Sequence, residues 1–457
     1  MNDRFHLAVI GSGSGGREAA LVAARNGLRV VLIEKGALGG TSFHRGYYSV
    51  RVFRACAEAA RESAKGSKFG QERRQSEADM PDWLSSQGRV SGRLAHELRD
   101  ILDKAGIEIR LGHGSLIDAN TIRVESVDGT PQLLHADYII LATGSRPDFA
   151  GQGPGFVNID QLLRLSYFPQ RLLIIGGGYI GCEMASIYRS LGSAVTLIEK
   201  RHLLPHWDQF IGEFIARALQ SSGVRLHFGQ DVDLQHPGGT REEPSFPVEG
   251  GLTVSADLVL VATGRKPNVE DLGLEHLNVE TAPFIRVDEC LRTSLPNVFG
   301  VGDVNGLGSM DSVAVAQARI AVGAILGKKN RFSQRWVPRC VHTDPQIASV
   351  GWTEAEADRA GLSAIAHSET FTVVTEDEKS VIDPVPVMVK ILVDPLSRQI
   401  LGVHAIGYHA AELVNTAALA ISSGTTIEDL SEITFVHPSA AEAIQKFSIK
   451  LGSIRAR

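Results

Sequence analysis

The stretch LAVIGSGSGGREAALVAARNGLRVVLIEK, Leu7 to Lys35, determines the expected fold of the first part of the chain. An apolar run ends at a glycine-rich turn, a helical pattern follows, and a second apolar run ends at Glu34. Gly11, Gly13 and Gly16 form a GxGxxG motif between strand and helix, the context in which the motif indicates a dinucleotide site. The first glycine permits a tight turn, the second lets the backbone approach a pyrophosphate, and the third allows close helix–strand packing. We therefore predict phosphates at the helix N-terminus and adenosine ribose hydroxyls bonded to Glu34.

A second copy of the pattern, LLIIGGGYIGCEMASIYRSLGSAVTLIEK, spans Leu172 to Lys200. Its glycines are Gly176, Gly178 and Gly181, and Glu199 follows the first of them by 23 residues, as Glu34 follows Gly11. Two copies predict two nucleotide sites.

The acid of the second copy bears on the choice of nucleotide. A carboxylate at Glu199 would repel a 2′-phosphate, which favours NAD(H) over NADP(H). Lys200, Arg201 and His202 follow directly and offer cationic groups able to hold that phosphate. We expect NADH to be the preferred donor.

Three later strands continue the pattern. The apolar strands in DYIILATGSRP (137–147) and DLVLVATGRKP (257–267) are each followed by Ala-Thr-Gly. The apolar strand in TSLPNVFGVGDV (293–304) is followed by Gly-Asp. Asp303 can either bond a ribityl hydroxyl or cap the next helix, which we expect over about 312–326. Before the first Ala-Thr-Gly strand we expect a polar helix around 97–105.

The last third of the chain has a different pattern. Two alternating strands flank an Asp-Pro turn at 387–407, and an apolar helix is expected near 410–422, which together indicate an α+β domain. A 457-residue chain is too long for one core. We predict an α/β protein with two Rossmann-like dinucleotide-binding domains, one over 1–147 and 268–336 and one over 148–267, and a C-terminal α+β domain over 337–457.

Composition excludes several classes of protein. Lys and Arg number 46 against 52 Asp and Glu, and this net charge of −6 argues against a nucleic-acid partner. No apolar run approaches the ~20 residues of a membrane helix, and the N-terminal apolar run is too short for a signal peptide. The cysteines are far apart without metal-site spacing, so we expect reduced thiols, no metal site and a cytoplasmic location. They are Cys56, Cys182, Cys290 and Cys340.

Taken together, these motifs resemble the pyridine nucleotide-disulfide oxidoreductase family, which includes lipoamide dehydrogenase, glutathione reductase, mercuric reductase and soluble transhydrogenase. The resemblance extends to VPRCVHTDPQIASVG at 337–351 and VHPSAAEA at 436–443, and so covers essentially the whole chain. It implies FAD on the first glycine motif, NAD(P)H on the second, and a homodimer that passes electrons to a small-molecule acceptor. Besides the glycines and acids above, it places along the cofactors Gly40, Thr41, Arg51, Gly114, Thr143, Gly144, Tyr179, Glu183, Gly264, Asp303 and Ala314. Of these, Gly114 is expected beside the adenine, and Tyr179 either gates the nicotinamide pocket or belongs to ordinary packing.

The chain departs from the family in GGTSFHRGYYSVR at 39–51. Ser42 and Tyr47 stand where the family has two redox cysteines, and neither residue can cycle between dithiol and disulfide. Arg51 replaces the family's lysine that pairs with the glutamate retained as Glu183, and it differs from lysine in bulk and geometry. His44, Arg45, Tyr47 and Tyr48 either form an aromatic and cationic pocket for an acceptor or carry no new chemistry.

His437 and Glu442 stand in the places of the family's His-Glu acid/base pair, which reaches the flavin of the partner subunit. A carboxylate orients an imidazole and raises its basicity, which makes the imidazole a proton donor near neutral pH. Without cysteines, His437 either protonates a different reduced acceptor or packs the dimer interface.

We therefore expect an FAD-dependent NAD(P)H oxidoreductase that passes hydride from nicotinamide to flavin and on to a non-disulfide acceptor such as a quinone. By analogy, transhydrogenation is the other leading acceptor class. A disulfide reductase that uses an unrecognised thiol and a non-catalytic redox sensor are the alternatives. Cys56 lies nine positions beyond Tyr47, about 13 Å along a helix, too far to replace a cysteine that touches the flavin.

Overall fold

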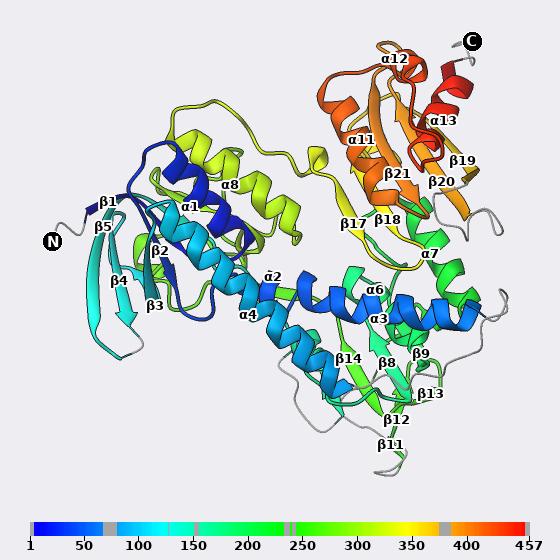
Figure 1. Ribbon diagram of the computed structural model, residues 1–457, viewed down its shortest axis with the longest axis horizontal. Helices are drawn as coiled ribbons and strands as arrows, with labels where there is room; N and C mark the ends of the chain where they lie inside the picture. Colours follow the sequence, from blue (N-terminus) through cyan, green and yellow to red (C-terminus); the bar gives the residue numbers. More distant parts are fainter. Residues whose placement is uncertain are drawn as a thin grey trace. The chain divides into compact units, whose positions relative to one another are not determined.

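The computed structural model describes residues 4–66, 80–126, 128–149, 155–232, 238–239, 244–373 and 385–452. The chain forms two compact units, each assembled from two separate stretches. The first unit combines Met1–Phe168 with Gly264–Gln334, and the second combines Pro169–Thr263 with Arg335–Arg457. Both are mixed α/β, which confirms the fold class (Figure 1).

A parallel sheet forms the centre of the first unit. Its strand order is β3-β2-β1-β5-β16, and β4 pairs antiparallel with both β3 and β5. Leu7, Ala8, Val9 and Ile10 on β1 are all buried, as expected for a parallel strand covered on both faces. The strands are β1 (Arg4–Ile10), β2 (Val30–Glu34), β3 (Glu108–Leu116), β4 (Thr121–Ser126), β5 (Pro131–Leu141) and β16 (Val298–Gly300).

Helices α1 (Ser14–Arg25) and α8 (Asp311–Ile325) pack against each other beside this sheet (Figure 1). Both contribute small buried residues, such as Ala19 and Ala23 on α1 and Ala318 on α8, which let the two helices approach closely. The bounds of α8 confirm the helix predicted over about 312–326.

Three further helices follow β2 in the first unit: α2 (Gly40–His44), α3 (Tyr47–Gly66) and α4 (Met80–Lys104). Helix α4 begins well before the predicted 97–105 segment. The sequence shows only part of this helix, because its described buried face is a narrow stripe in a charged surface. Leu98 and Leu102, four residues apart, belong to that stripe. The remaining elements are β6 (Ser145–Pro147), β7 (Phe156–Val157), α5 (Ile159–Leu162), β15 (Arg265–Pro267), η2 (Glu275–Leu277) and η3 (Asp303–Asn305).

The second unit contains a parallel sheet of order β10-β9-β8-β14. Its strands are β8 (Arg171–Ile175), β9 (Ala194–Glu199), β10 (Arg225–Phe228) and β14 (Leu258–Val261), and its helices are α6 (Tyr179–Ser190) and α7 (Gln209–Ser221). Three short antiparallel strands accompany this sheet: β11 (Gly238–Gly239), β12 (Pro244–Val248) and β13 (Leu252–Ser255).

The same unit carries an antiparallel sheet of order β17-β18-β21-β20-β19. Helix α11 (Ala410–Ser422), as predicted, packs on β18 and β21. The strands are β17 (Arg339–Val341), β18 (Ile347–Gly351), β19 (Ile365–Val373), β20 (Val385–Val393) and β21 (Ile400–Ile406), and the other helices are η4 (Gln334–Trp336), α9 (Glu354–Arg359), α12 (Ile427–Glu432) and α13 (Glu442–Gly452).

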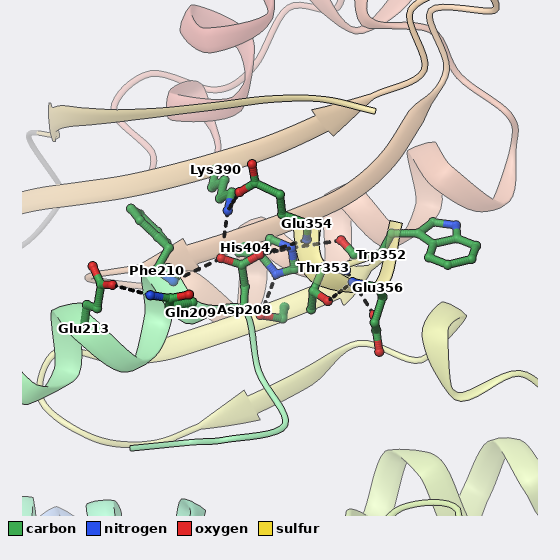
Figure 2. Close-up of polar contacts among 11 residues, drawn as sticks. Asp208, Gln209, Phe210, Glu213, Trp352, Thr353, Glu354, Glu356, Lys390 and His404 are labelled. Atoms are coloured by element: carbon green, nitrogen blue, oxygen red, sulfur yellow. Dashed lines mark hydrogen bonds and ion pairs between the residues drawn. The ribbon is translucent and has the colours of Figure 1, made fainter. Parts of the chain in front are cut away.

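A buried charged cluster joins the two parts of the second unit (Figure 2). Asp208, which caps α7 by accepting from the Phe210 N–H, also accepts from Lys390 Nζ on β20 at 2.9 Å. Lys390 Nζ donates in addition to Glu354 at 2.5 Å, and the Glu354 N–H donates to Asp208. Burial disfavours the charged form of Asp208, but His404 and Lys390 together hold the pKa of Asp208 below its usual value. The cluster therefore fastens α7 to the antiparallel sheet.

His404 completes this cluster from β21 and is fully buried. Its Nε2 donates to the Trp352 carbonyl at 3.0 Å, so its Nδ1 accepts from the Ser349 hydroxyl at 3.0 Å. Burial lowers the pKa of His404 to about 4, so the ring is neutral near pH 7.

Within the described ranges, no helix combines the length and apolar character needed to cross a membrane.

Candidate functional site

The first glycine motif has the backbone geometry that a dinucleotide site requires. Gly11 has φ of +101°, and a Cβ there would lie 2.4 Å from the Ala142 carbonyl oxygen. A Cβ on Gly16 would lie 1.8 Å from the Gly11 oxygen, so both positions exclude any side chain. Gly13, by contrast, faces open space and begins α1 without a side-chain cap. The first N–H groups of α1 can therefore receive a pyrophosphate, which fits FAD.

Glu34 closes this motif at the end of β2. Its Oε2 accepts from the Ser12 N–H at 2.8 Å and the Ser12 hydroxyl at 2.6 Å, and its Oε1 accepts from the Gly36 N–H at 2.8 Å. A carboxylate accepts about four hydrogen bonds, so capacity for a ribose hydroxyl remains. Ser12 holds Glu34 in place and was not among the residues singled out from the sequence.

Asp303 lies on η3, in the same unit. Its Oδ2 accepts from the Ser145 hydroxyl at 2.5 Å, and Arg265 Nε lies 3.7 Å from the same oxygen. Burial raises the pKa of Asp303, an effect that Ser145 and Arg265 only partly offset. The residue that precedes α8 is Met310 and no side-chain cap forms there, so Asp303 does not cap that helix. A buried carboxylate held by a serine is compatible with the predicted bond to a ribityl hydroxyl.

Other predicted cofactor residues in the first unit connect the loops around Asp303. The Thr143 hydroxyl donates to the Asn268 carbonyl at 2.7 Å. Gly144 and Gly264 each face open space where a Cβ would be. Ala314 on α8 is buried, and a Cβ added at Gly15 or Gly302 would lie 3.5 Å from its Cβ. Gly114 on β3 packs against Ile33, where a Cβ would come within 3.1 Å.

The segment at 39–51 is held by contacts within the first unit. Gly40 has φ of +58°, and a Cβ on it would lie 3.0 Å from the Gly13 Cα, so α2 starts directly beside the first glycine motif. Thr41 follows it, and then Ser42, which is buried. The Ser42 hydroxyl donates to Asp311 Oδ2 at 2.5 Å. Asp311 in turn accepts from the Ser14 hydroxyl at 2.8 Å through its Oδ1.

Asp311 was missed by sequence reasoning. It lies eight residues after Asp303, in the first turn of a predicted helix, where an acid has an ordinary helix-stabilising explanation. Its two serine partners lie 297 and 269 residues away in the chain, and no local spacing rule joins them.

Aromatic residues gather after Ser42. The rings of Phe43 and Tyr48 meet edge to face at 5.3 Å, and so do those of Tyr47 and Tyr48. The Tyr47 side chain is 40% exposed, which leaves it accessible to a small molecule. His44 Nε2 contacts the Leu38 carbonyl, and the His44 ring meets the Phe43 ring edge to face at 6.4 Å, whereas Arg45 pairs with Asp160. Arg51 is exposed on α3.

The second glycine motif repeats the geometry of the first. Gly176 has φ of +108°, and a Cβ on Gly181 would lie 1.9 Å from the Gly176 oxygen. Gly178 faces open space and precedes Tyr179, the half-buried first residue of α6. Glu199 is held as Glu34 is, because its two oxygens accept from the N–H groups of Gly177 at 2.6 Å and Arg201 at 2.9 Å.

Lys200, which follows Glu199, pairs with Asp231 at 2.6 Å. Both side chains are more than half exposed, and the hydrogen bond from Lys200 holds the pKa of Asp231 below its usual value. Asp231 was not identified from the sequence, because it lies in a loop 31 positions from its partner.

The structure brings His437 and Glu442 together. His437 Nδ1 lies 2.9 Å from Glu442 Oε1, and the Ser439 N–H donates to the other oxygen at 3.1 Å. Burial alone would raise the pKa of Glu442, but His437 and Ser439 hold it below its usual value. His437 is 75% exposed, so its Nε2 is accessible to a partner group. Glu183, the glutamate that the sequence analysis expects near the flavin, accepts from the His342 N–H at 2.7 Å.

All four cysteines are free. Burial raises the pKa of Cys56 to about 11 and also raises that of Cys182. A raised pKa leaves little thiolate at neutral pH, and thiolate is the reactive form. Among the described residues, no group of three or more His, Cys, Asp or Glu side chains is arranged to hold a metal ion.

Two glycine loops of this geometry on parallel sheets define a flavoprotein oxidoreductase with two dinucleotide sites. Residues 5–321 match the pyridine nucleotide-disulphide oxidoreductase family, and residues 337–447 match the dimerisation domain of that family. The chain belongs to this family, and it is an FAD-dependent pyridine nucleotide oxidoreductase. The matching dimerisation domain supports a homodimer.

Individual relatives fall into two named activities. The chain is 32% identical over 452 residues to a dihydrolipoyl dehydrogenase from Chlorobaculum tepidum, covering 97% of this chain and 96% of the relative. It is 33% identical over 465 residues to a soluble pyridine nucleotide transhydrogenase from Yersinia enterocolitica, covering 97% of each.

Two solved structures have the same fold. LpdA from Mycobacterium tuberculosis matches with a TM-score of 0.88 at 25% identity, over 98% of this chain and 99% of its own. A Cu(II) complex of the HOCl-induced flavoprotein disulfide reductase RclA from Escherichia coli matches with a TM-score of 0.83 at 25% identity, over 99% and 100%.

Proposed function

We propose that this enzyme uses NADH to reduce a small-molecule acceptor that is not a disulfide, such as a quinone, through FAD. The flavin supplies the hydride chemistry, while the chain binds and orients the two nucleotides. The observation that carries the proposal is Ser42, which occupies a redox cysteine position and whose hydroxyl is bonded to Asp311. Tyr47, at the other cysteine position, is a partly exposed phenol in an aromatic cluster.

The proposal assigns roles by domain. The glycine motif at 11–16 with Glu34 and Asp303 binds FAD in residues 1–147 and 268–336, and the motif at 176–181 binds NADH in residues 148–267. Residues 337–457 form the dimerisation domain, from which His437, oriented by Glu442, donates a proton to the reduced acceptor. An accessible imidazole bonded to a partly buried carboxylate at 2.9 Å supports this role.

The preference for NADH rests on Glu199 and Asp231. Glu199 is fixed by two backbone N–H groups, so its carboxylate remains where a 2′-phosphate would lie. Lys200, the first cation able to neutralise that phosphate, is already paired with Asp231.

Transhydrogenation between the two nicotinamide nucleotides is the second candidate. It is favoured by the relative named soluble pyridine nucleotide transhydrogenase at 33% identity. It requires NADPH to enter the second site, which Glu199 opposes. Activity between NADPH and a thio-NAD⁺ analogue, measured beside NADH–quinone activity, ranks the two candidates.

Anaerobic titration of the purified holoenzyme tests the main proposal. We expect reduction to stop at two electrons per flavin, without a long-wavelength thiolate-to-flavin band at half reduction. NADH should support turnover with a quinone or ferricyanide and none with lipoamide or glutathione disulfide, and arsenite, which traps dithiols, should not inhibit. Uptake of four electrons, or arsenite-sensitive lipoamide turnover, would show that a distant thiol such as Cys56 has been recruited.

A further inference from the structure

Asp311 belongs neither to the glycine motifs nor to the pair of His437 and Glu442, and the sites described above give it no role. Its two carboxylate oxygens accept from Ser14 at 2.8 Å and Ser42 at 2.5 Å, and both serines are buried. The Asp311 side chain itself is exposed, so the carboxylate has protein donors on one side and open space on the other.

The neighbours of Asp311 show which part of the first unit its exposed carboxylate faces. Ser14 follows Gly13 in the first glycine motif, and Ser42 follows Thr41 on α2. Ala314, one helical turn further along α8, packs against the same motif. Each of these neighbours is a proposed FAD residue or stands next to one, so Asp311 lies among them.

Asp303 gives a second, electrostatic link to the same place. The negative charge of Asp311 contributes to the raised pKa of Asp303, so the two carboxylates lie within electrostatic reach of each other. The proposed FAD site therefore contains two acids, and Arg265 lies beside one of them, Asp303.

A charge at this place affects flavin reduction in a defined direction. A hydride carries two electrons and one proton, so accepting it adds one negative charge to the flavin ring system. A fixed carboxylate nearby disfavours that added charge, and partial enclosure weakens the screening by solvent. The oxidised flavin is thereby favoured over the reduced flavin.

We propose that Asp311 lowers the midpoint potential of the flavin, and so makes the reduced flavin a stronger electron donor to its acceptor. This inference rests on the proposed FAD site. It gives Ser42 a role as well, because the serine at the former cysteine position orients the carboxylate. In a chain without a thiol relay, the flavin itself must reduce the acceptor, and a lower potential increases the driving force of that step.

Asp311→Asn in the FAD-loaded dimer is the direct test, with the midpoint potential measured by equilibration against redox dyes. The substitution removes the charge, while the amide can still accept from one serine and donate to the other, because a hydroxyl both donates and accepts. We expect a more positive potential, faster reduction by NADH and slower reoxidation by a low-potential quinone. Asp358→Asn, which removes an exposed acid from α9 in the other unit, is the matched control and should leave the potential unchanged.

Asp311→Glu separates charge from shape. Because it keeps the charge, its potential should stay close to that of the unmodified enzyme. An unchanged potential in Asp311→Asn overturns the inference, and so do equal shifts in the Asn and Glu variants, which would trace the effect to geometry. Loss of FAD from Asp311→Asn alone also overturns it, because that would make Asp311 a binding residue. Absence of flavin from the unmodified protein would instead refute the proposed function.

Discussion

The two glycine motifs share one backbone design but are braced in different ways. In both, the first glycine has a positive φ above 100° and the third has no room for a Cβ. Glu34 and Glu199 each accept from one backbone N–H in the glycine loop. Each also accepts from the backbone N–H of the residue two positions after the glutamate itself. The backbone of the repeat is thus the same in both units.

The surroundings of the two motifs differ. The first is enclosed by its own unit: Ser12 adds its hydroxyl to Glu34, and Asp311 joins Ser14 to Ser42. The second carries an exposed pair of Lys200 with Asp231 at its acidic end. An enclosed site suits a cofactor that stays bound, whereas an accessible site suits a substrate that must exchange. The same motif can therefore serve two different kinetic roles.

The largest expected effect separates the reduction of the flavin by NADH from its reoxidation by the acceptor. His437→Gln should leave flavin reduction by NADH nearly intact and slow reoxidation by a quinone by about 10- to 1000-fold, the usual range of acid/base catalysis. Ferricyanide accepts electrons without protons, so its rate should not change. Stopped-flow measurements of both half-reactions check this. Equal losses with quinone and ferricyanide, or no loss with either, would make His437 structural.

The buried cluster of Asp208, Lys390 and His404, which fastens α7 to the antiparallel sheet, should make the protein sensitive to acid. His404 has a pKa of about 4 when folded, against its ordinary value of 6.5. The unfolded chain therefore binds the proton first as the pH falls through 6.5, and stability should decrease until about pH 4, by a total of order 3 kcal/mol. His404→Gln should flatten this pH dependence of the unfolding free energy. Identical slopes in variant and unmodified protein would exclude His404 as the cause.

Matched glycine substitutions test whether the two motifs are independent. Overpacking costs about 1–3 kcal/mol, so Gly16→Ala should weaken FAD binding by about 10- to 100-fold, measured from the flavin content after gel filtration. Gly181→Ala should retain FAD and lose NADH affinity to a similar extent. If Gly181→Ala also lost FAD, the motifs would not be the separate sites that the comparison describes.

The smallest expected effect concerns the exposed end of the second motif. Asp231→Asn should free Lys200 to approach a 2′-phosphate and improve binding of 2′-phospho-ADP-ribose by at most about fivefold, because exposed ion pairs are weak. Binding of ADP-ribose serves as the control and should not change. Calorimetric titration with both ligands checks the prediction, and an equal change for both would rule out a specific effect on the phosphate.

The sequence by itself determined the parts of the site that depend on neighbouring residues. The glycine spacing, the acid 23 positions later and the apolar runs predicted β1, α1 and β2 and their repeat in β8, α6 and β9, and the structure contains them. These predictions succeed because turns, helix periodicity and strand burial follow from residues a few positions apart. The apolar helix α11 was predicted for the same reason. The described side chains of α3 and α4 bury a narrow stripe, which the charged surfaces of these helices obscure in the sequence.

Only the tertiary structure decided which distant side chains meet. Asp311 reaches Ser14 across 297 positions, and Lys390 reaches Asp208 across 182. An acid in the first turn of a helix and a lysine on an alternating strand are ordinary residues in their own segments. They acquire these partners only when packing brings the remote segments together. For the buried Lys390 a partner is also necessary, because an unpaired buried charge is costly and a hydrogen-bonded one is tolerated. Local sequence sets the backbone of each nucleotide site, and the packing of remote segments sets its charge.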